Sequence, residues 1–160
     1  SWAFALSPDG ARYTRMKVED PTTLQLRAIA TGEVLWETPT EDGIIGIAAF
    51  TPDGSRVIST PHERSGQMKV WNANTGELLT TLRGHRAHVT SMDFMDDGRT
   101  LISTSADHTI RLWDLETGEP LGMLRGHNEE DRSGVMHPDG KTFFSGSYDG
   151  EVLALSLIHI

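Results

Sequence analysis

A four-residue turn motif recurs along the chain at an almost constant interval. It reads SPDG, TPDG, MDDG and HPDG, and its glycines are Gly10, Gly54, Gly98 and Gly140. The steps between these glycines are 44, 44 and 42 residues. An Asp-Gly pair favours a tight hairpin turn, because glycine adopts a positive φ without steric cost. The chain is therefore predicted to contain about four copies of one structural unit, each built around this hairpin.

A second motif keeps the same interval. It reads ATGEVL, NTGELL and ETGEPL, and it places glycines at Gly32, Gly76 and Gly118. Short runs rich in β-branched and apolar residues flank both motifs, such as RVIST after TPDG and MKVW one turn later. Such runs predict strands, and no segment carries a sustained helical period. A period in the low forties suits a unit of four short strands, so the chain is predicted to be nearly all β.

The two motifs divide each unit into four expected strands, whose positions we list in chain order within the unit. First strands are expected near 2–6, 44–50, 88–94 and 132–136, and second strands near 12–17, 56–60, 99–104 and 141–146. Third strands are expected near 22–27, 67–72, 109–114 and 151–156, and fourth strands near 33–37, 77–82 and 119–124.

The stretch from residue 83 to residue 114 reads RGHRAHVTSMDFMDDGRTLISTSADHTIRLWD. With its Gly-His pair, turn motif, aspartate and Trp-Asp pair, it resembles the tryptophan-aspartate (WD) repeat family, and the rest of the chain follows the pattern in weaker form. The resemblance implies an all-β WD-repeat β-propeller with about four blades here, as half or a fragment of a seven- or eight-bladed ring. Blades are expected at about 1–38, 39–82, 83–124 and 125–160, the last lacking its outer strand.

Serine, histidine and aspartate lie close together around residues 103–108, which raises the alternative of a hydrolase. The chain has no nucleophile-elbow sequence of the G-x-S-x-G kind. The WD-repeat resemblance implies instead that His85, Ser103, Asp107 and Trp113 form a buried hydrogen-bond network. The carboxylate fixes one imidazole nitrogen, the other nitrogen accepts from the hydroxyl, and the indole donates to an oxygen. These residues are therefore expected to be structural, and no catalytic residue is expected.

The fourth blade is expected to hold the same network through His127, Ser145 and Asp149, with Leu155 in the tryptophan position. Its first strand carries Asp131 where the other blades have an apolar residue. An acidic residue at a core position is expected to shorten the strand or displace it outward. Fast hydrogen exchange is expected over residues 127–133.

The first two blades depart further from the pattern. The second blade retains Trp71, but Glu41 stands in the histidine position and its PHERSGQ turn offers no matching aspartate. The first blade has Asp20 in the corresponding turn, Arg15 in the serine position and Leu26 in the tryptophan position. Only the third blade is expected to hold the complete network.

Composition excludes several classes of partner and cofactor. The formal net charge of -9 and the pI near 5.1 oppose binding to nucleic acid or to an anionic membrane. The chain has no cysteine, which excludes disulfides and Cys-ligated metals, and its seven histidines form no cluster of metal ligands in the sequence. We expect no metal and no cofactor. The compartment stays open, with the cytoplasm favoured.

Proteins of the WD-repeat family generally bind partners on the face where the loops before the first strands meet the turns between second and third strands. Positions on that face were counted from the turn aspartates. They give Trp2, Thr90, Arg132, His88, Glu19 and Tyr148. Trp, Tyr and Arg are the residues most enriched in interface hot spots, so Trp2, Arg132 and Tyr148 are the favoured candidates.

The resemblance implies a non-catalytic protein–protein interaction scaffold whose partner is a protein or peptide. Two alternatives remain: a propeller enzyme with a channel-lining site, and a purely structural segment of a larger multidomain protein. Four blades leave two blade flanks uncovered. A homodimer that closes an eight-bladed ring, or the remainder of a longer propeller chain, is therefore expected to cover them.

Overall fold

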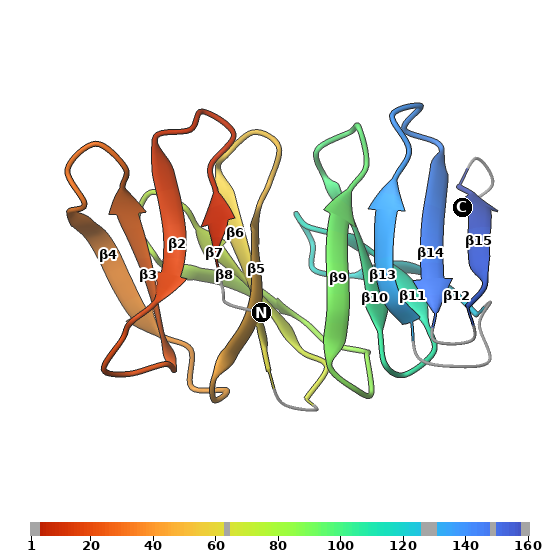
Figure 1. Ribbon diagram of the computed structural model, residues 1–160, viewed down its shortest axis with the longest axis horizontal. Helices are drawn as coiled ribbons and strands as arrows, with labels where there is room; N and C mark the ends of the chain where they lie inside the picture. Colours follow the sequence, from red (N-terminus) through yellow and green to blue (C-terminus); the bar gives the residue numbers. More distant parts are fainter. Residues whose placement is uncertain (1–3, 63–64, 126–130, 148–149, 158–160) are drawn as a thin grey trace.

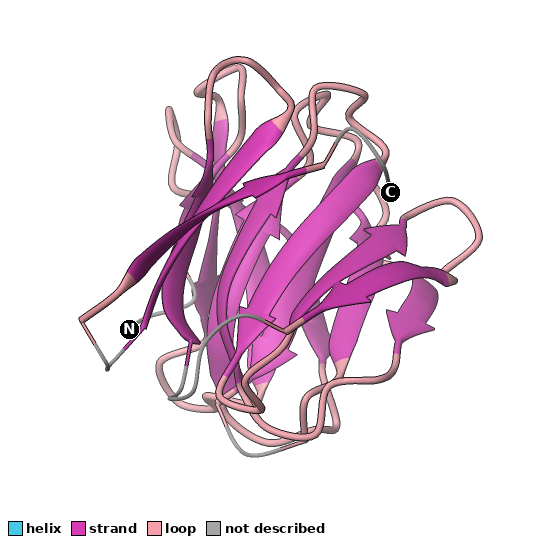
Figure 2. Cartoon of the chain, turned by 90° about the vertical axis from the view of Figure 1, so that its right-hand side faces the viewer, coloured by secondary structure: helices cyan, strands magenta, loops and turns pink. Residues whose placement is uncertain are grey.

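The computed structural model describes residues 4–62, 65–125, 131–147 and 150–157 (Figure 1). The regular secondary structure of these residues consists of strands, as Figure 2 shows, and none of it is helical. The described part accordingly has no helix long and apolar enough to cross a membrane. The all-β prediction is confirmed.

The strands form four antiparallel sheets, each built from strands that are consecutive in the chain. The first sheet contains β1 (Ala5–Leu6), β2 (Arg12–Met16), β3 (Thr23–Ala28) and β4 (Val34–Pro39). The second contains β5 (Ile45–Phe50), β6 (Arg56–Pro61), β7 (Met68–Asn72) and β8 (Leu78–Leu82). The third contains β9 (Val89–Phe94), β10 (Thr100–Ser105), β11 (Ile110–Asp114) and β12 (Pro120–Leu124). Among the described residues, the fourth contains β13 (Asp131–Met136), β14 (Thr142–Ser147) and β15 (Val152–Ser156).

Each predicted strand has an observed counterpart, because the turn glycines locate the hairpins. The prediction of a shortened first strand at Asp131 was wrong, since β13 has six residues, as β5 and β9 do. The neighbouring sheet supports its backbone: Ser91 Oγ accepts from the amide of Gly134 at 2.9 Å, and Asp93 Oδ2 accepts from that of Met136 at 2.6 Å. Residues 127–130 of the expected mobile stretch lie outside the described residues.

The sheets stand side by side in chain order (Figure 1), and apolar side chains fill the space between neighbours. Successive residues of a strand point to opposite faces, so one strand supplies two cores. On β6, Val57 packs toward the first sheet and Ile58 toward the third. On β10, Leu101 packs toward the second sheet and Ile102 toward the fourth. Each inner sheet is therefore buried on both faces.

The turn that carries Gly76 fits against the preceding sheet. Gly76 has a φ of +75°, and a Cβ there would lie 2.9 Å from the indole ring of Trp36 on β4. The indole Nε1 of Trp36 donates a hydrogen bond of 3.0 Å to the Ala73 carbonyl. At the next junction Thr80 on β8 takes the place of Trp36. A Cβ added at Gly118 would lie 2.6 Å from Thr80 Oγ1. The repeated Thr-Gly-Glu turn thus also forms the contact between sheets.

Arginines that follow the first turn motif link neighbouring sheets. Arg12 donates to the carbonyls of Ala73 at 3.2 Å and Gly54 at 3.1 Å, and to Asn74 Oδ1 at 3.1 Å. Arg56 repeats this arrangement one unit later, where it donates to the Leu115 carbonyl. One side chain therefore joins the second strand of one sheet to the turns of the next.

We predict that Arg12→Ala lowers the free energy of unfolding by about 1–3 kcal/mol, because it leaves partly buried carbonyls without their donor. Arg83→Ala is the matched control, since Arg83 is exposed and makes no side-chain hydrogen bond to a described residue. Urea unfolding followed by circular dichroism measures both variants. Equal midpoints for the two variants would contradict the linking role of Arg12.

Candidate functional site

The third sheet holds a hydrogen-bond network of four side chains. Trp113 Nε1 donates to Ser103 Oγ at 2.8 Å, and Ser103 Oγ lies 2.7 Å from His85 Nε2. On the other side of the imidazole, Nδ1 lies 3.0 Å from Asp107 Oδ2. Because a carboxylate only accepts, Nδ1 carries the proton, Nε2 accepts from the serine hydroxyl, and the hydroxyl accepts from the indole. Each polar atom of the network has its partner.

Asp107 anchors the network to two loops. Its Oδ2 also accepts from the backbone amide of Arg86 at 2.8 Å, and its Oδ1 accepts from Thr109 Oγ1 at 2.5 Å. Burial of the carboxyl by itself raises its pKa, but the hydrogen bonds from His85, Thr109 and Arg86 outweigh burial and hold the pKa of Asp107 well below its usual range. Asp107 therefore stays ionised and pins the loop before β9 to the β10–β11 turn.

The network is closed to a substrate. Ser103 and Trp113 are fully buried, and His85 is 5% exposed. A catalytic serine must reach the substrate and face an oxyanion hole, whereas the Ser103 hydroxyl lies inside the core with both partners in place. The described residues also contain no group of three or more His, Cys, Asp or Glu side chains that could hold a metal ion. This geometry performs a structural task.

The second sheet uses an ion pair where the third uses the histidine. Trp71 Nε1 donates to Ser59 Oγ at 2.8 Å, as in the third sheet. Lys69 Nζ lies 5.8 Å from the centre of the Trp71 ring, pairs with Asp42 Oδ2 at 2.7 Å and donates to the Thr40 carbonyl. Lys69 thus holds the loop before β5. Sequence reasoning missed this pair, although an amine two residues before the tryptophan was a usable signal.

The first sheet corrects the predicted tryptophan position. Trp113 pairs with Leu101 across β10 and β11, and the matching pair in the first sheet is Tyr13 with Arg27. Leu26 instead faces the second sheet and is fully buried. The prediction of Leu26 was therefore wrong by one residue, because Arg27 follows the turn aspartate Asp20 by seven residues, whereas Trp113 follows Asp107 by six.

The fourth sheet shows part of its predicted network. Ser145 is buried on β14, and Leu155 pairs with Phe143 as Trp113 pairs with Leu101. His127 and Asp149 lie outside the described residues. A complete network in this sheet therefore stays a prediction.

The structure describes three of the six candidate partner-binding residues. Thr90 is the second residue of β9, and its Oγ1 lies 2.8 Å from Thr104 Oγ1. The His88 carbonyl accepts from Ser105 Oγ at 3.0 Å, so the loop before β9 is held by β10. Glu19 is exposed in the β2–β3 turn. Trp2 and Tyr148 lie outside the described residues, as does the side chain of Arg132 in β13.

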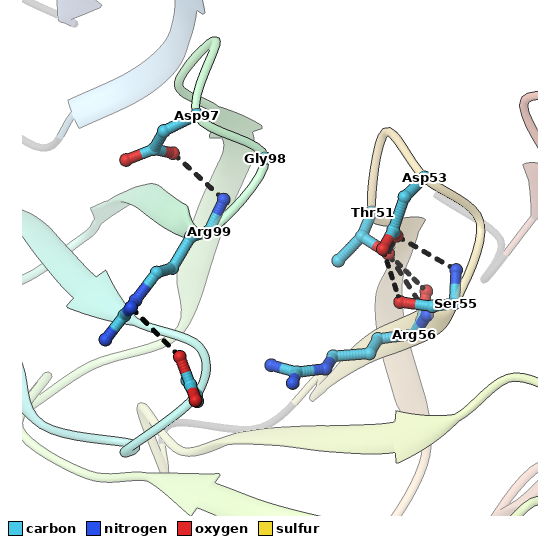
Figure 3. A pocket seen from close by; sticks show the side chains of 8 residues that line it. Thr51, Asp53, Ser55, Arg56, Asp97, Gly98 and Arg99 are labelled. Carbon is cyan, nitrogen blue, oxygen red and sulfur yellow. Dashed lines mark hydrogen bonds and ion pairs between the residues drawn. The ribbon is translucent and has the colours of Figure 1, made fainter.

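A polar hollow of about 250 Å³ lies between the β5–β6 and β9–β10 turns, and sequence analysis did not anticipate it (Figure 3). Arg56 and Arg99 extend from the two turns, with Asp53, Asp97 and Glu116 beside them. The Arg99 guanidinium pairs with Asp114 at 2.6 Å and with Glu116 at 2.9 Å. Hydrogen bonds from Arg99 lower the pKa of Asp114 to about 2. Arg99 is thus ion-paired within the protein and Arg56 donates to the Leu115 carbonyl, so both arginines of the hollow serve contacts inside the protein.

Comparisons with known proteins agree with this arrangement. The sequence profile of the family described as "WD domain, G-beta repeat" matches residues 76–114 and 118–153. The first match contains Ser103, Asp107 and Trp113, and the second contains Ser145.

Several curated proteins match part of the chain. Nuclear distribution protein PAC1 of Arthroderma benhamiae is 40% identical over 68 residues, which are 42% of this chain and 14% of that protein. Periodic tryptophan protein 2 homolog of Schizosaccharomyces pombe is 36% identical over 64 residues, 40% of this chain and 7% of that protein. Transducin beta-like protein 3 of Rattus norvegicus is 31% identical over 65 residues, 41% of this chain and 8% of that protein. The aligned region is about a seventh or less of the length of each of these relatives.

We predict that Asp107→Ala destabilises the protein far more than Asp20→Ala. The first change leaves the buried His85 and the Arg86 amide without their acceptor, at about 1–3 kcal/mol for each unpaired group. Among the described residues the Asp20 carboxylate accepts hydrogen bonds only from Thr22 and Thr23, so its loss stays within one turn. Thermal unfolding of both variants tests the ranking, and equal losses of stability would refute it.

Proposed function

The chain belongs to the WD40-repeat family, and from this premise we propose that it is a non-catalytic protein-interaction scaffold. Its partner is a protein or peptide, bound on the face formed by the loops before the first strands and the turns between second and third strands. The proposed contact residues are Trp2, Thr90, Arg132, His88, Glu19 and Tyr148.

One observation carries the proposal: the hydrogen bonds of Asp107 and Ser105 hold the loop before β9 rigidly. Asp107 binds His85 and the Arg86 amide, and Ser105 Oγ donates to the Ala87 carbonyl at 3.1 Å and the His88 carbonyl at 3.0 Å. A surface loop with its backbone fixed in this way loses little conformational entropy when a partner binds. The burial of Ser103 favours this role over that of a hydrolase.

A propeller enzyme is the second candidate, and the charged hollow beside Arg56 and Arg99 brings five ionisable groups together. Arg99 forms ion pairs with both Asp114 and Glu116, and this pairing argues against acid–base catalysis in the hollow. A hydrolase screen together with bound-metal analysis separates the two candidates.

The contact face is tested by affinity capture and cross-linking mass spectrometry with the wild-type chain as bait. We predict that a partner recovered by the wild type is lost with Trp2→Ala/Arg132→Ala, because aromatic and arginine side chains supply most of the free energy of such interfaces. Lys141→Ala, an exposed lysine in the turn between the first and second strands of the fourth sheet and so outside the proposed face, should retain the partner. Equal recovery by all three proteins would contradict the proposal that Trp2 and Arg132 contact the partner.

We also propose that the chain works as part of a larger assembly. The fourth sheet exposes Val135 and Val152, which are 57% and 71% exposed, on the face turned away from the third sheet. The inner sheets bury the corresponding face against a neighbour. The neighbour is a second copy that closes an eight-bladed ring, or the remainder of a longer propeller.

Multi-angle light scattering at micromolar concentration tests the assembly. A particle of twice the mass of one chain is expected if a second copy closes the ring. A particle of one chain's mass with broad, weakly cooperative unfolding is expected if the remainder of a longer chain is needed. A stable single-chain particle with one sharp unfolding transition would contradict both versions.

A further inference from the structure

Six aspartates of the chain are followed directly by a glycine. At such a pair the glycine amide nitrogen can attack the aspartate Cγ, because glycine has no side chain that blocks the approach. A C–N bond forms and one carboxylate oxygen leaves as water, which takes one proton from the amide and one from the solvent. Water then opens this cyclic succinimide to give aspartate again or isoaspartate, whose main chain runs through Cγ.

Four of these pairs belong to the repeated turn motif, and hydrogen bonds hold both reacting groups there. The glycine amide donates to the carbonyl of the third residue before it, at 2.8 to 3.0 Å. The aspartate Oδ1 accepts from the amide of the second residue after it, also at 2.8 to 3.0 Å. Attack on Cγ would have to break both bonds, so the turn protects its own aspartate. The four protected residues are Asp9, Asp53, Asp97 and Asp139.

The fifth pair, Asp42 and Gly43, lies in the loop before β5 and lacks both restraints. No described residue accepts a hydrogen bond from the Gly43 amide, and no described amide donates to the Asp42 carboxylate. Among the described residues Gly43 is held through its carbonyl, which accepts from Thr40 Oγ1 at 3.4 Å. The amide nitrogen and the carboxyl carbon are therefore both free to react. Asp149 of the sixth pair lies outside the described residues.

The surroundings of Asp42 favour the remaining steps of the reaction. Lys69 Nζ lies 2.7 Å from Asp42 Oδ2, so its ammonium can donate the second proton that this oxygen needs to leave as water. Lys69 then regains a proton from the solvent. The Asp42 side chain is 26% exposed, so water can reach the succinimide and open it.

We propose that Asp42 is a modification site, at which the chain forms isoaspartate through a succinimide with Gly43. The modification adds a methylene group to the main chain and moves the carboxylate from the end of the side chain to the α-carbon. Lys69 thereby loses the ion pair that holds the loop before β5. The reaction needs no partner, so the proposal stands apart from the proposed contact face.

Peptide mapping of the aged whole chain tests the site. The protein is incubated for several weeks at neutral pH and body temperature, and electron-transfer mass spectrometry then measures isoaspartate at each Asp-Gly pair. We expect about tenfold or more isoaspartate at Asp42 than at any of the four turn aspartates, because the turns must first break two hydrogen bonds. Incubation in concentrated urea should remove this difference, since the turns and the loop are then unfolded.

Two variants locate the reaction. Asp42→Glu keeps the negative charge but would have to close a six-membered ring, which forms far more slowly, so the product at this position should disappear. Glu41→Gln is the matched control, because Glu41 is the exposed neighbour of Asp42 and takes no part in the reaction. It should form as much isoaspartate as the wild type does.

Hydrogen exchange measures the effect on the loop. The amides of Thr40 and Ile45 donate to the Thr22 carbonyl at 2.9 Å and the Pro21 carbonyl at 3.3 Å, which ties the loop to the first sheet. In the isoaspartate form, separated by chromatography, these two amides should exchange faster than in the unmodified chain. Residues 89–94 of β9 should exchange equally in both forms.

Three results would overturn the proposal. Equal isoaspartate at Asp42 and at the turn aspartates of the folded chain would show that the turns give no protection. A ratio that urea leaves unchanged would show that the fold does not select the site. Unchanged exchange at Thr40 and Ile45 in the isoaspartate form would show that the modification does not release the loop.

Discussion

Burial of each inner sheet on both faces is the constraint on which the rest of the structure depends. Strands β6 and β10 each send alternate side chains into two different cores. Val57 and Ile58 do so on β6, and Leu101 and Ile102 do so on β10. No single sheet of three or four short strands can bury enough apolar surface by itself, so its stability comes from its neighbours. The contacts between sheets, more than the hairpins, are what make this chain a folded protein.

That constraint explains why polar networks lie at the sheet junctions. A strand end buried against a neighbour carries backbone groups and loops that must be satisfied without water. The third sheet meets this need with His85, Ser103 and Asp107, and the second sheet meets it with the Lys69–Asp42 ion pair. Two different sets of side chains therefore fix equivalent loops, and the stability of the loop before β9 follows from the network beneath it.

The strands could be predicted from the sequence because Asp-Gly and Thr-Gly turns mark both ends of most of them. Register could not be counted across the β2–β3 turn, because Arg27, which takes the position assigned to Leu26, follows the turn aspartate Asp20 by one residue more than Trp113 follows Asp107. The Lys69–Asp42 pair was missed because its partners are 27 residues apart and neither belongs to the repeated motif. The polar hollow was missed for a similar reason, since it depends on the distance between two turns that the sequence describes only separately. Local chemistry was thus predictable, and contacts between units were not.

The fit of Trp36 against Gly76 limits how this chain can be rearranged in evolution or by design. A large indole meets the glycine turn at one junction, and the much smaller Thr80 meets it at the next. Each repeat therefore carries half of a size-matched pair whose other half is in the following repeat. Duplicating, deleting or exchanging a single repeat would bring together halves of unlike volume, so the repeats resemble one another in sequence without being interchangeable parts.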